Sequence, residues 1–240
     1  MIGCDCAVCR STDPRDNRLR PSIYVEADDG TRILVDTTPD FRQQALRYDL
    51  RRVDAVVYTH AHADHVLGLD ELRRYNHMTR QPVPLYGEPH TLEQIRQTFA
   101  YAFQKGARAG GGVPDLTTHE LDGGPFAIGG QAITPIPVRH GTWTIFGFRF
   151  GRFAYLTDCN AVPDTSLPLL QDLDVLVLDA LRHRPHPTHF TVAQAIAAAK
   201  QIGAKQTLFT HICHDLGHAE TAATLPDGIG LAYDGLRLSL

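Results

Sequence analysis

The sequence predicts an α+β protein built from two mixed β-sheets that pack together, with helices on their outer faces. Predicted helices and strands alternate along the chain, which favours parallel pairing between strands that a helix connects. Several strands nevertheless come in neighbouring pairs joined by short turns, which favours antiparallel hairpins. The chain has 240 residues, of which 43% are apolar and 21% charged, as is typical of a globular protein. We therefore expect one large domain over residues 1–240.

The first half of the chain is expected to hold strands, helices and a Gly-rich loop. The turn Asp28-Asp29-Gly30 joins the segments SIYVEAD and TRILVDT into a hairpin. Pro39 suits the first turn of the helix that follows, because its fixed φ is helical and no N–H donor is needed there. The Gly-rich segment 105–118 has the composition of a mobile loop, and we expect it to line the substrate pocket. In chain order, the expected strands are 22–28, 31–37 and 53–58, and the expected helices are 39–50, 69–77 and 90–104.

The second half is expected to be mainly strands, with one helix. Thr191 suits the N-cap of that helix, because its hydroxyl can accept a hydrogen bond from the first turn. The helix is expected over 191–202, and the strands over 131–138, 145–150, 152–157, 174–179, 206–210 and 229–238.

Three apolar strands end in a threonine that is followed at once by a side chain able to bind a metal. Functional sites are commonly assembled from the ends of strands on a rigid sheet, so the repetition of this pattern indicates one shared site. The pairs are Thr59-His60, Thr157-Asp158 and Thr210-His211.

Charge and hydropathy exclude several classes of protein. The formal net charge of −4 excludes a broad basic surface that would hold nucleic acid by charge alone. No run of roughly 18 or more apolar residues occurs, so no membrane span is predicted. The N-terminal residues lack the basic and apolar regions of a signal peptide, so we expect a cytoplasmic protein in a reducing compartment.

Five cysteines are present, and three of them lie close together at Cys4, Cys6 and Cys9. Disulfides rarely persist in a reducing compartment, so three free thiols in a loop are one interpretation. The alternative is a metal site, because closely spaced thiolates repel one another unless a cation neutralises them. The spacing C-x-C-x2-C supplies three soft ligands, and a fourth must come from elsewhere in the chain.

The strongest chemical signal is the segment His60-Ala-His62-Ala-Asp64-His65, which follows a buried strand. Residues two apart on a helix point in different directions, so this spacing does not describe one helical face. In a loop that leaves a strand, the first two histidines can chelate one ion while the aspartate and the last histidine turn to another. A polar loop without function would not require four residues of ligand type.

This pattern resembles the signature of the metallo-β-lactamase fold superfamily, and the resemblance covers about residues 22–215. It implies a four-layer αββα sandwich with two metal ions at the edge of the sheets. It also implies three further ligands in the chain order His, bridging Asp and His. By this resemblance, His60, His62 and His140 hold one ion, Asp64, His65 and His211 hold the other, and Asp158 bridges them.

A closer resemblance is to the phosphoribosyl 1,2-cyclic phosphate phosphodiesterases of phosphonate degradation. It implies a structural zinc bound by Cys4, Cys6, Cys9 and His214, and it implies that His189 positions the phosphate. Members of that family begin with a strand and a loop ahead of the cysteines. Only three residues precede the first cysteine here, so we expect the usual first strand of the fold to be absent.

The predicted chemistry is hydrolysis by a hydroxide that the two ions share. Two cations about 3.5–4 Å apart lower the pKa of bound water towards 7 and stabilise charge on a phosphoryl group. Imidazole and carboxylate ligands suit Zn²⁺, Mn²⁺ or Fe, and the sequence leaves this choice open. His189 and Asp64 are the predicted catalytic residues. Asp36 and Asp179 can orient ligand imidazoles. Two interpretations stay open for Arg182, His183, Arg184 and His186, which could add positive charge for a phosphate but are each interpreted first as solvated loop residues. His218 is interpreted as a surface residue.

Three classes of function remain open. The favoured one is a phosphodiesterase that acts on a small cyclic sugar phosphate or a related diester, without a membrane partner. The second is another hydrolase on the same fold, such as a thioesterase or an RNA-processing nuclease, although the negative charge argues against a nucleic-acid partner. The third is a non-catalytic metal-binding protein. A homodimer is compatible with the sequence.

Overall fold

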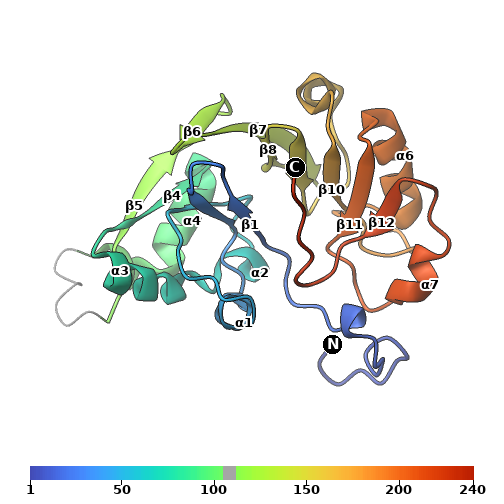
Figure 1. The fold of residues 1–240 in the computed structure, drawn as a ribbon, viewed down its shortest axis with the longest axis horizontal. Coiled ribbons are helices and arrows are strands. Elements are labelled where there is room, and N and C mark those ends of the chain that lie inside the picture. Colours follow the sequence, from blue (N-terminus) through green and yellow to red (C-terminus); the bar gives the residue numbers. More distant parts are fainter. Residues whose placement is uncertain (105–111) are drawn as a thin grey trace. The chain divides into compact units, whose positions relative to one another are not determined.

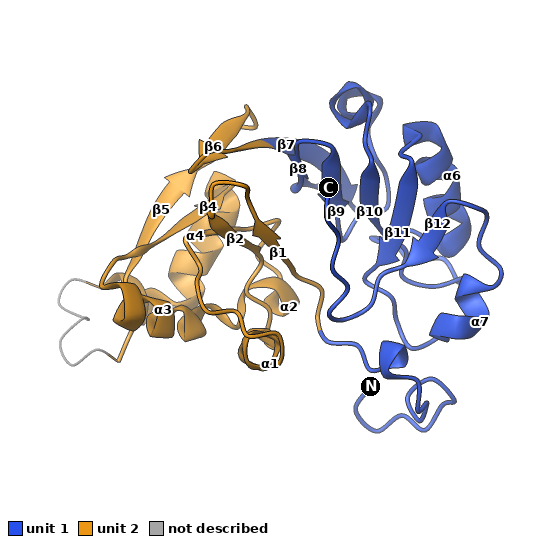
Figure 2. Ribbon diagram, in the orientation of Figure 1, with its two compact units in different colours: residues 1–19, 134–240 blue, residues 20–133 orange. Residues whose placement is uncertain are grey.

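The computed structural model describes residues 1–104 and 112–240, and Figure 1 shows their arrangement. The chain divides into two compact units, residues 1–19 with 134–240 (unit 1) and residues 20–133 (unit 2), which Figure 2 colours separately. Each unit has a hydrophobic core of its own. The single domain expected over residues 1–240 therefore stays a prediction. Most of the predicted loop 105–118 lies outside the described residues, and its last part is not loop, because β5 begins at Leu116.

Unit 2 is built on a five-stranded mixed sheet in the order β1-β2-β3-β4-β5. β1 and β2 form the predicted antiparallel hairpin, and the remaining neighbours pair in parallel. No strand precedes β1 within residues 1–22, all of which the structure describes. The strands are β1 (Ile23–Glu26), β2 (Arg32–Val35), β3 (Ala55–Val57), β4 (Val83–Gly87) and β5 (Leu116–Glu120).

The helices of unit 2 cover one face of this sheet. Phe41 of the first helix and Leu92 of α4 are fully buried in one core with Leu85 of β4. Burial of such side chains stabilises the unit by roughly 1.5–3 kcal/mol each. The helices are α1 (Phe41–Arg47), α2 (Ala63–Val66), η2 (Leu69–Leu72), α3 (Arg73–Thr79), α4 (Pro89–Thr98) and α5 (Ala100–Phe103).

The second sheet runs in the order β12-β11-β10-β9-β8-β7-β6, and β8 to β12 lie wholly in unit 1. β9, β10, β11 and β12 pair in parallel, in the register Leu156↔Leu178 and Asp179↔Thr210. The carboxyl ends of β9, β10 and β11 therefore lie at the same edge. The strands are β6 (Phe126–Ile128), β7 (Gln131–His140), β8 (Trp143–Phe150), β9 (Phe153–Leu156), β10 (Val175–Asp179), β11 (Gln206–Thr210) and β12 (Ile229–Leu231).

Helix α6 (Val192–Ile202) begins and ends as its sequence predicts. Thr191 accepts a hydrogen bond from the Gln194 N–H, and the Gln194 side chain accepts one from the Thr191 N–H, which forms a capping box. Gly203 closes the helix at φ 74°, a left-handed conformation that glycine adopts without strain. Figure 1 shows α6 against the sheet of unit 1, beside α7 (His218–Ala222). Two short 3-10 helices, η1 (Pro14–Asp16) and η3 (Asp164–Leu170), complete this unit.

The structure corrects several expectations. The predicted strand 229–238 is only the three residues of β12. β4 was missed because Pro84 interrupts its apolar pattern, and proline usually marks an edge or the absence of a strand. His218, expected at the surface, is 4% exposed, because the start of α7 packs its ring against Tyr233. The α+β class with two mixed sheets is confirmed. Among the described residues, no helix combines the length and the apolar character that crossing a bilayer requires.

Candidate metal-binding sites

The four predicted ligands of unit 2 lie together just beyond the end of β3. His60 Nε2 is 3.0 Å from His62 Nδ1, and the rings of His60 and His65 are 4.3 Å apart. The Asp64 carboxylate lies 3.8 Å from His65 Nε2. The chain leaves β3 in an extended conformation and enters the short helix α2 after His62, so both sides of the turn contribute side chains. Within this unit the structure brings all four residues together.

Asp36 holds one of these imidazoles in place. It follows β2 and accepts a hydrogen bond from His65 Nδ1 at 2.8 Å and two more from the amide and hydroxyl of Thr59. The carboxyl group is fully buried, and burial raises its pKa. With Nδ1 bonded to Asp36, Nε2 is the nitrogen of His65 that would bind a metal. The contact expected of Asp36 is therefore present, whereas the part of Thr59 was not foreseen.

In unit 1, Asp158 and His211 meet at the shared edge of the sheet. His211 Nε2 lies 3.2 Å from an oxygen of the Asp158 carboxylate, and the Thr157 hydroxyl donates to the same oxygen at 2.8 Å. Both residues adopt positive φ, at 52° for Asp158 and 56° for His211. Asp36 does so as well, at 66°. This conformation is uncommon for residues other than glycine, and such strain gathers at functional sites.

His140 ends β7, immediately before a tight turn. Its Nδ1–H donates to the carbonyl of Thr188 at 2.9 Å, so Nε2 is the nitrogen that would bind a metal. The Gly141 N–H donates to the Asn160 side chain, whose amide donates in turn to the carbonyl of Pro187. Gly141 has φ 65°, and a Cβ atom there would come within 2.9 Å of Thr188. The turn therefore requires glycine for both its conformation and its packing.

His189 is buried beside His211, where the two rings stack with centroids 4.6 Å apart. Its Nδ1–H donates to Asp179 at 2.9 Å, and the second oxygen of that carboxylate accepts from the Phe190 N–H. Burial raises the pKa of Asp179 well above its usual range. Asp158, Asp179, His189 and His211 each offer a ligand atom, and these atoms all lie within 4.8 Å of one another. Asp179 was expected to orient a metal ligand, but its short hydrogen bond is to His189, while His211 Nδ1 is 3.9 Å away.

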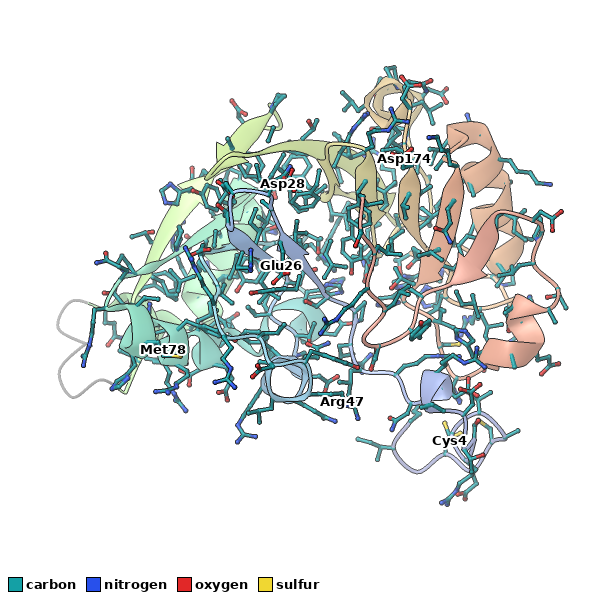
Figure 3. The ribbon with its side chains drawn as sticks, in the orientation of Figure 1. Cys4, Glu26, Asp28, Arg47, Met78 and Asp174 are labelled. Carbon is teal, nitrogen blue, oxygen red and sulfur yellow. The ribbon has the colours of Figure 1, made fainter. Side chains whose placement is uncertain are left out.

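The cysteine cluster also lies in unit 1. Cys4, Cys6 and Cys9 and His214 offer ligand atoms that all lie within 4.8 Å of one another. Figure 3 shows Cys4 in the N-terminal loop, with sulfur atoms in yellow around it. The Sγ atoms of Cys4 and Cys6 are each 3.4 Å from His214 Nδ1. Cys4 and His214 are 210 positions apart in the chain, so it is the folding of the chain that brings the fourth candidate ligand to the three cysteines.

The geometry of this cluster fits a tetrahedral ion. Zinc bonds of about 2.3 Å to sulfur and about 2.0–2.1 Å to nitrogen place the two ligand atoms about 3.6 Å apart in a tetrahedron. The observed separations of 3.4 Å are close to that value. Hydrogen bonds from the Cys9 N–H and from His214 lower the pKa of Cys6 to about 6, which favours the thiolate that a metal requires. All five cysteines are free thiols, and Cys159 is buried, as expected of a packed side chain.

Each unit therefore holds part of the predicted set of metal ligands, with the side chains close enough together to bind a metal ion. Imidazoles whose second nitrogen is bonded to a carboxylate or a carbonyl are typical metal ligands, and the donor set fits Zn²⁺, Mn²⁺ or Fe. The assignment of ligands from both units to two particular ions stays a prediction from the sequence.

Comparison with known proteins places the chain among related folds. A profile of the Beta-lactamase superfamily domain matches residues 31–212. A solved structure described as a new diphosphatase from the PhnP family superimposes with a TM-score of 0.92 and 48% identity, over 100% of this chain and 91% of that one. The predicted metallo-β-lactamase-like fold and the relationship to the PhnP family are thereby confirmed.

Curated relatives have more varied names. An octanoyltransferase of Porphyromonas gingivalis is 38% identical over 237 residues, which is 98% of this chain and 48% of that protein. A ribonuclease Z of Bradyrhizobium diazoefficiens is 33% identical over 141 residues, covering 57% of this chain and 46% of that protein. The chain thus spans about half the length of the curated relatives it matches.

Proposed function

We propose, from the premise that this chain belongs to the β-lactamase superfamily, that it is a metal-dependent hydrolase of small phosphodiesters. The observation that carries the proposal is the pair formed by His189 and Asp179. The buried carboxylate accepts from Nδ1, which directs Nε2 away from it, beside the ring of His211. Such a histidine can donate a proton or a hydrogen bond to a phosphoryl oxygen or a leaving group, and this role contributes typically about 10²–10⁴-fold to the rate.

The metal ligands are proposed as the sequence predicts them. Bound divalent ions would supply Lewis acidity and a nucleophilic water at neutral pH. The chain's own residues orient those ligands, because Asp36 fixes the tautomer of His65 and the carbonyl of Thr188 fixes that of His140. In the proposed sets, one ion is held by His60, His62 and His140 and the other by Asp64, His65 and His211, with Asp158 shared and a structural zinc on Cys4, Cys6, Cys9 and His214.

The finer substrate assignment is a phosphoribosyl cyclic phosphate or a related small diester, hydrolysed in the cytoplasm without a membrane partner. The similarity to a diphosphatase of the PhnP family supports phosphoryl chemistry. The second candidate is RNA processing, which the similarity to ribonuclease Z favours. The net charge of −4 argues against it, because tight binding to a polyanion usually requires excess positive charge.

An assay of metal-loaded protein against a substrate panel tests the proposal. The panel contains bis(p-nitrophenyl) phosphate, cyclic ribose phosphates, 2′,3′-cyclic nucleotides, a precursor tRNA, a thioester and a β-lactam. We expect turnover of the small diesters, and expect it to be lost with chelator and restored with Zn²⁺ or Mn²⁺. Turnover confined to the thioester, the β-lactam or the tRNA would refute the phosphodiesterase assignment.

A further inference from the structure

A three-residue turn before α6 connects a further histidine to the candidate site. His186 Nδ1 lies 3.3 Å from the Thr188 amide nitrogen and 3.2 Å from the Thr188 hydroxyl. The carbonyl of the same Thr188 accepts the hydrogen bond of His140. One threonine therefore contacts both histidines, and the next residue is His189. These contacts favour the alternative that His186 contributes to phosphate binding over its interpretation as a solvated loop residue.

These contacts decide which nitrogen of His186 carries hydrogen. A backbone amide can only donate, so Nδ1 must be the acceptor. In a neutral imidazole the other nitrogen, Nε2, then carries the hydrogen. Burial lowers the pKa of His186, which favours the neutral ring near pH 7. Among the described residues, Nε2 of His186 has no hydrogen-bond partner.

His186 also lies beside the imidazoles of the site in unit 1. Its ring centroid is 4.9 Å from that of His189, which lies 5.0 Å from His140 and 4.6 Å from His211. His189 is buried, whereas His186 is half-buried, so the ring of His186 lies beside that of His189 and is partly open to solvent. A neutral N–H at this place suits an anion, because hydrogen bonds to charged acceptors are roughly twice as strong as neutral ones.

We propose that His186 is a substrate-binding residue whose Nε2–H donates to a non-bridging oxygen of the phosphoryl group that His189 contacts. The inference rests on the proposed phosphodiesterase function and deepens it. The preferred ligand under this proposal is an anionic phosphoryl group, because two of its oxygens can accept hydrogen bonds from the two neighbouring imidazoles. A neutral ester or thioester offers only one carbonyl oxygen and gains nothing from the second donor.

Two substitutions separate this role from a structural one. His186→Asn keeps an oxygen that can accept from the amide two residues later, as asparagine does in Asx turns, but it removes the distal N–H. His186→Gln keeps an N–H far from the backbone but loses the acceptor close to it. His183→Asn is the matched control, because His183 is an exposed histidine in the same loop.

The first readout is the binding of inorganic phosphate to metal-loaded protein by calorimetry, and the second is KM for bis(p-nitrophenyl) phosphate. We expect His186→Asn to weaken phosphate binding and raise KM by about tenfold or more, as for loss of a hydrogen bond to a charged group. His186→Gln should recover part of that loss, and His183→Asn should match the wild type. Metal content should be the same in all four proteins.

The outcomes distinguish this inference from the function on which it rests. If the wild type hydrolyses the diester and His186→Asn equals it in phosphate affinity and KM, the inference is overturned and the function stands. Impairment of His186→Gln alone would assign His186 to the turn, which also overturns it. If the wild type neither hydrolyses diesters nor binds phosphate, the proposed function fails and the inference fails with it.

Discussion

Two clusters of unit 1 present candidate metal ligands in opposite ways. They are the cysteine cluster of Cys4, Cys6, Cys9 and His214, and the histidine–aspartate cluster of Asp158, Asp179, His189 and His211. Cys4, Cys6 and Cys9 lie in an irregular N-terminal loop, and the Sγ atoms of Cys4 and Cys6 each lie 3.4 Å from His214 Nδ1. Asp158 and His211 instead follow strands whose parallel register aligns their ends. We expect the first arrangement to need an ion to hold the loop together. The second is held by the sheet, so we expect an ion there to serve chemistry rather than stability.

The largest effect is expected at the strand ends. Asp158→Ala removes the carboxylate that contacts His211, so the rate of hydrolysis and the metal content should both fall. The rate should fall further than the loss of about 10–100-fold that is typical when a residue that only orients a metal ligand is removed. Steady-state kinetics and metal analysis by mass spectrometry measure both. Asp158→Asn is the control for the backbone, because asparagine tolerates the positive φ that alanine does not. Near-full activity with undiminished metal would show that Asp158 is not a ligand.

His189→Ala is expected to come next, because it removes the side chain proposed to contact the substrate and leaves the proposed metal ligands in place. Its kcat for a phosphodiester should fall by about 10²-fold or more, with KM changed much less and metal content unchanged. Kinetics and metal analysis on the same preparation test this. A fall in activity that added metal restores would assign His189 to the metal instead, which the neighbouring Asp158, Asp179 and His211 would permit.

Cys6→Ser should have the opposite effect, with a loss of stability and little loss of activity. Total zinc should fall by one ion per chain and thermal stability should drop, while turnover at low temperature persists. A structural zinc is worth about 10–16 kcal/mol of apparent binding energy in peptides, and each kcal/mol of stability lost lowers Tm by about 2–4 °C in a chain of this size. Calorimetry and metal analysis measure the change. Cys213→Ser is the matched control, because Cys213 is half-buried and lies outside the cluster. Equal zinc and equal Tm in both variants would contradict the comparison.

The smallest effect is expected at an ion pair remote from both clusters. Asp174 pairs with Arg152 and Lys205 at 2.8 Å, and these partners lower its pKa to about 2. The pKa of aspartate in an unfolded chain is about 3.9. The ion pairs of Asp174 therefore stabilise the fold above that pH, and this stabilisation is lost as the pH falls towards 2. Asp174→Asn should lower Tm slightly at pH 7, with the difference narrowing below about pH 4. Asp172→Asn, an exposed neighbour, should show no such difference. A pH-independent difference would mean that the effect is not ionic.

Much of the fold could be predicted because local signals agreed with the final structure. The Asp28-Asp29-Gly30 turn and the Thr191 cap each specify their element through bonds within a few residues. The predictions for β4 and β12 were wrong for the opposite reason. The extent of each strand depends on pairing with neighbouring strands. The local pattern is misleading because Pro84 lies within β4 and a polar tail follows β12. Burial of His218 likewise depends on Tyr233 and cannot be deduced from the residues beside it.

The side chains that are candidates for metal chemistry could be identified without the structure. Short spacings such as His60-x-His62 and Cys4-x-Cys6 restrict where ligand atoms can lie, and the matching order of the later ligands identified the superfamily. The nitrogen of each imidazole that would bind a metal, in contrast, is known only from the folded structure. That choice depends on a hydrogen-bond partner far along the chain, as Asp36 is for His65 and Thr188 for His140. The proposed role of His186 rests on a contact of the same kind, because Thr188, whose amide donates to His186, also accepts a hydrogen bond from His140 through its carbonyl.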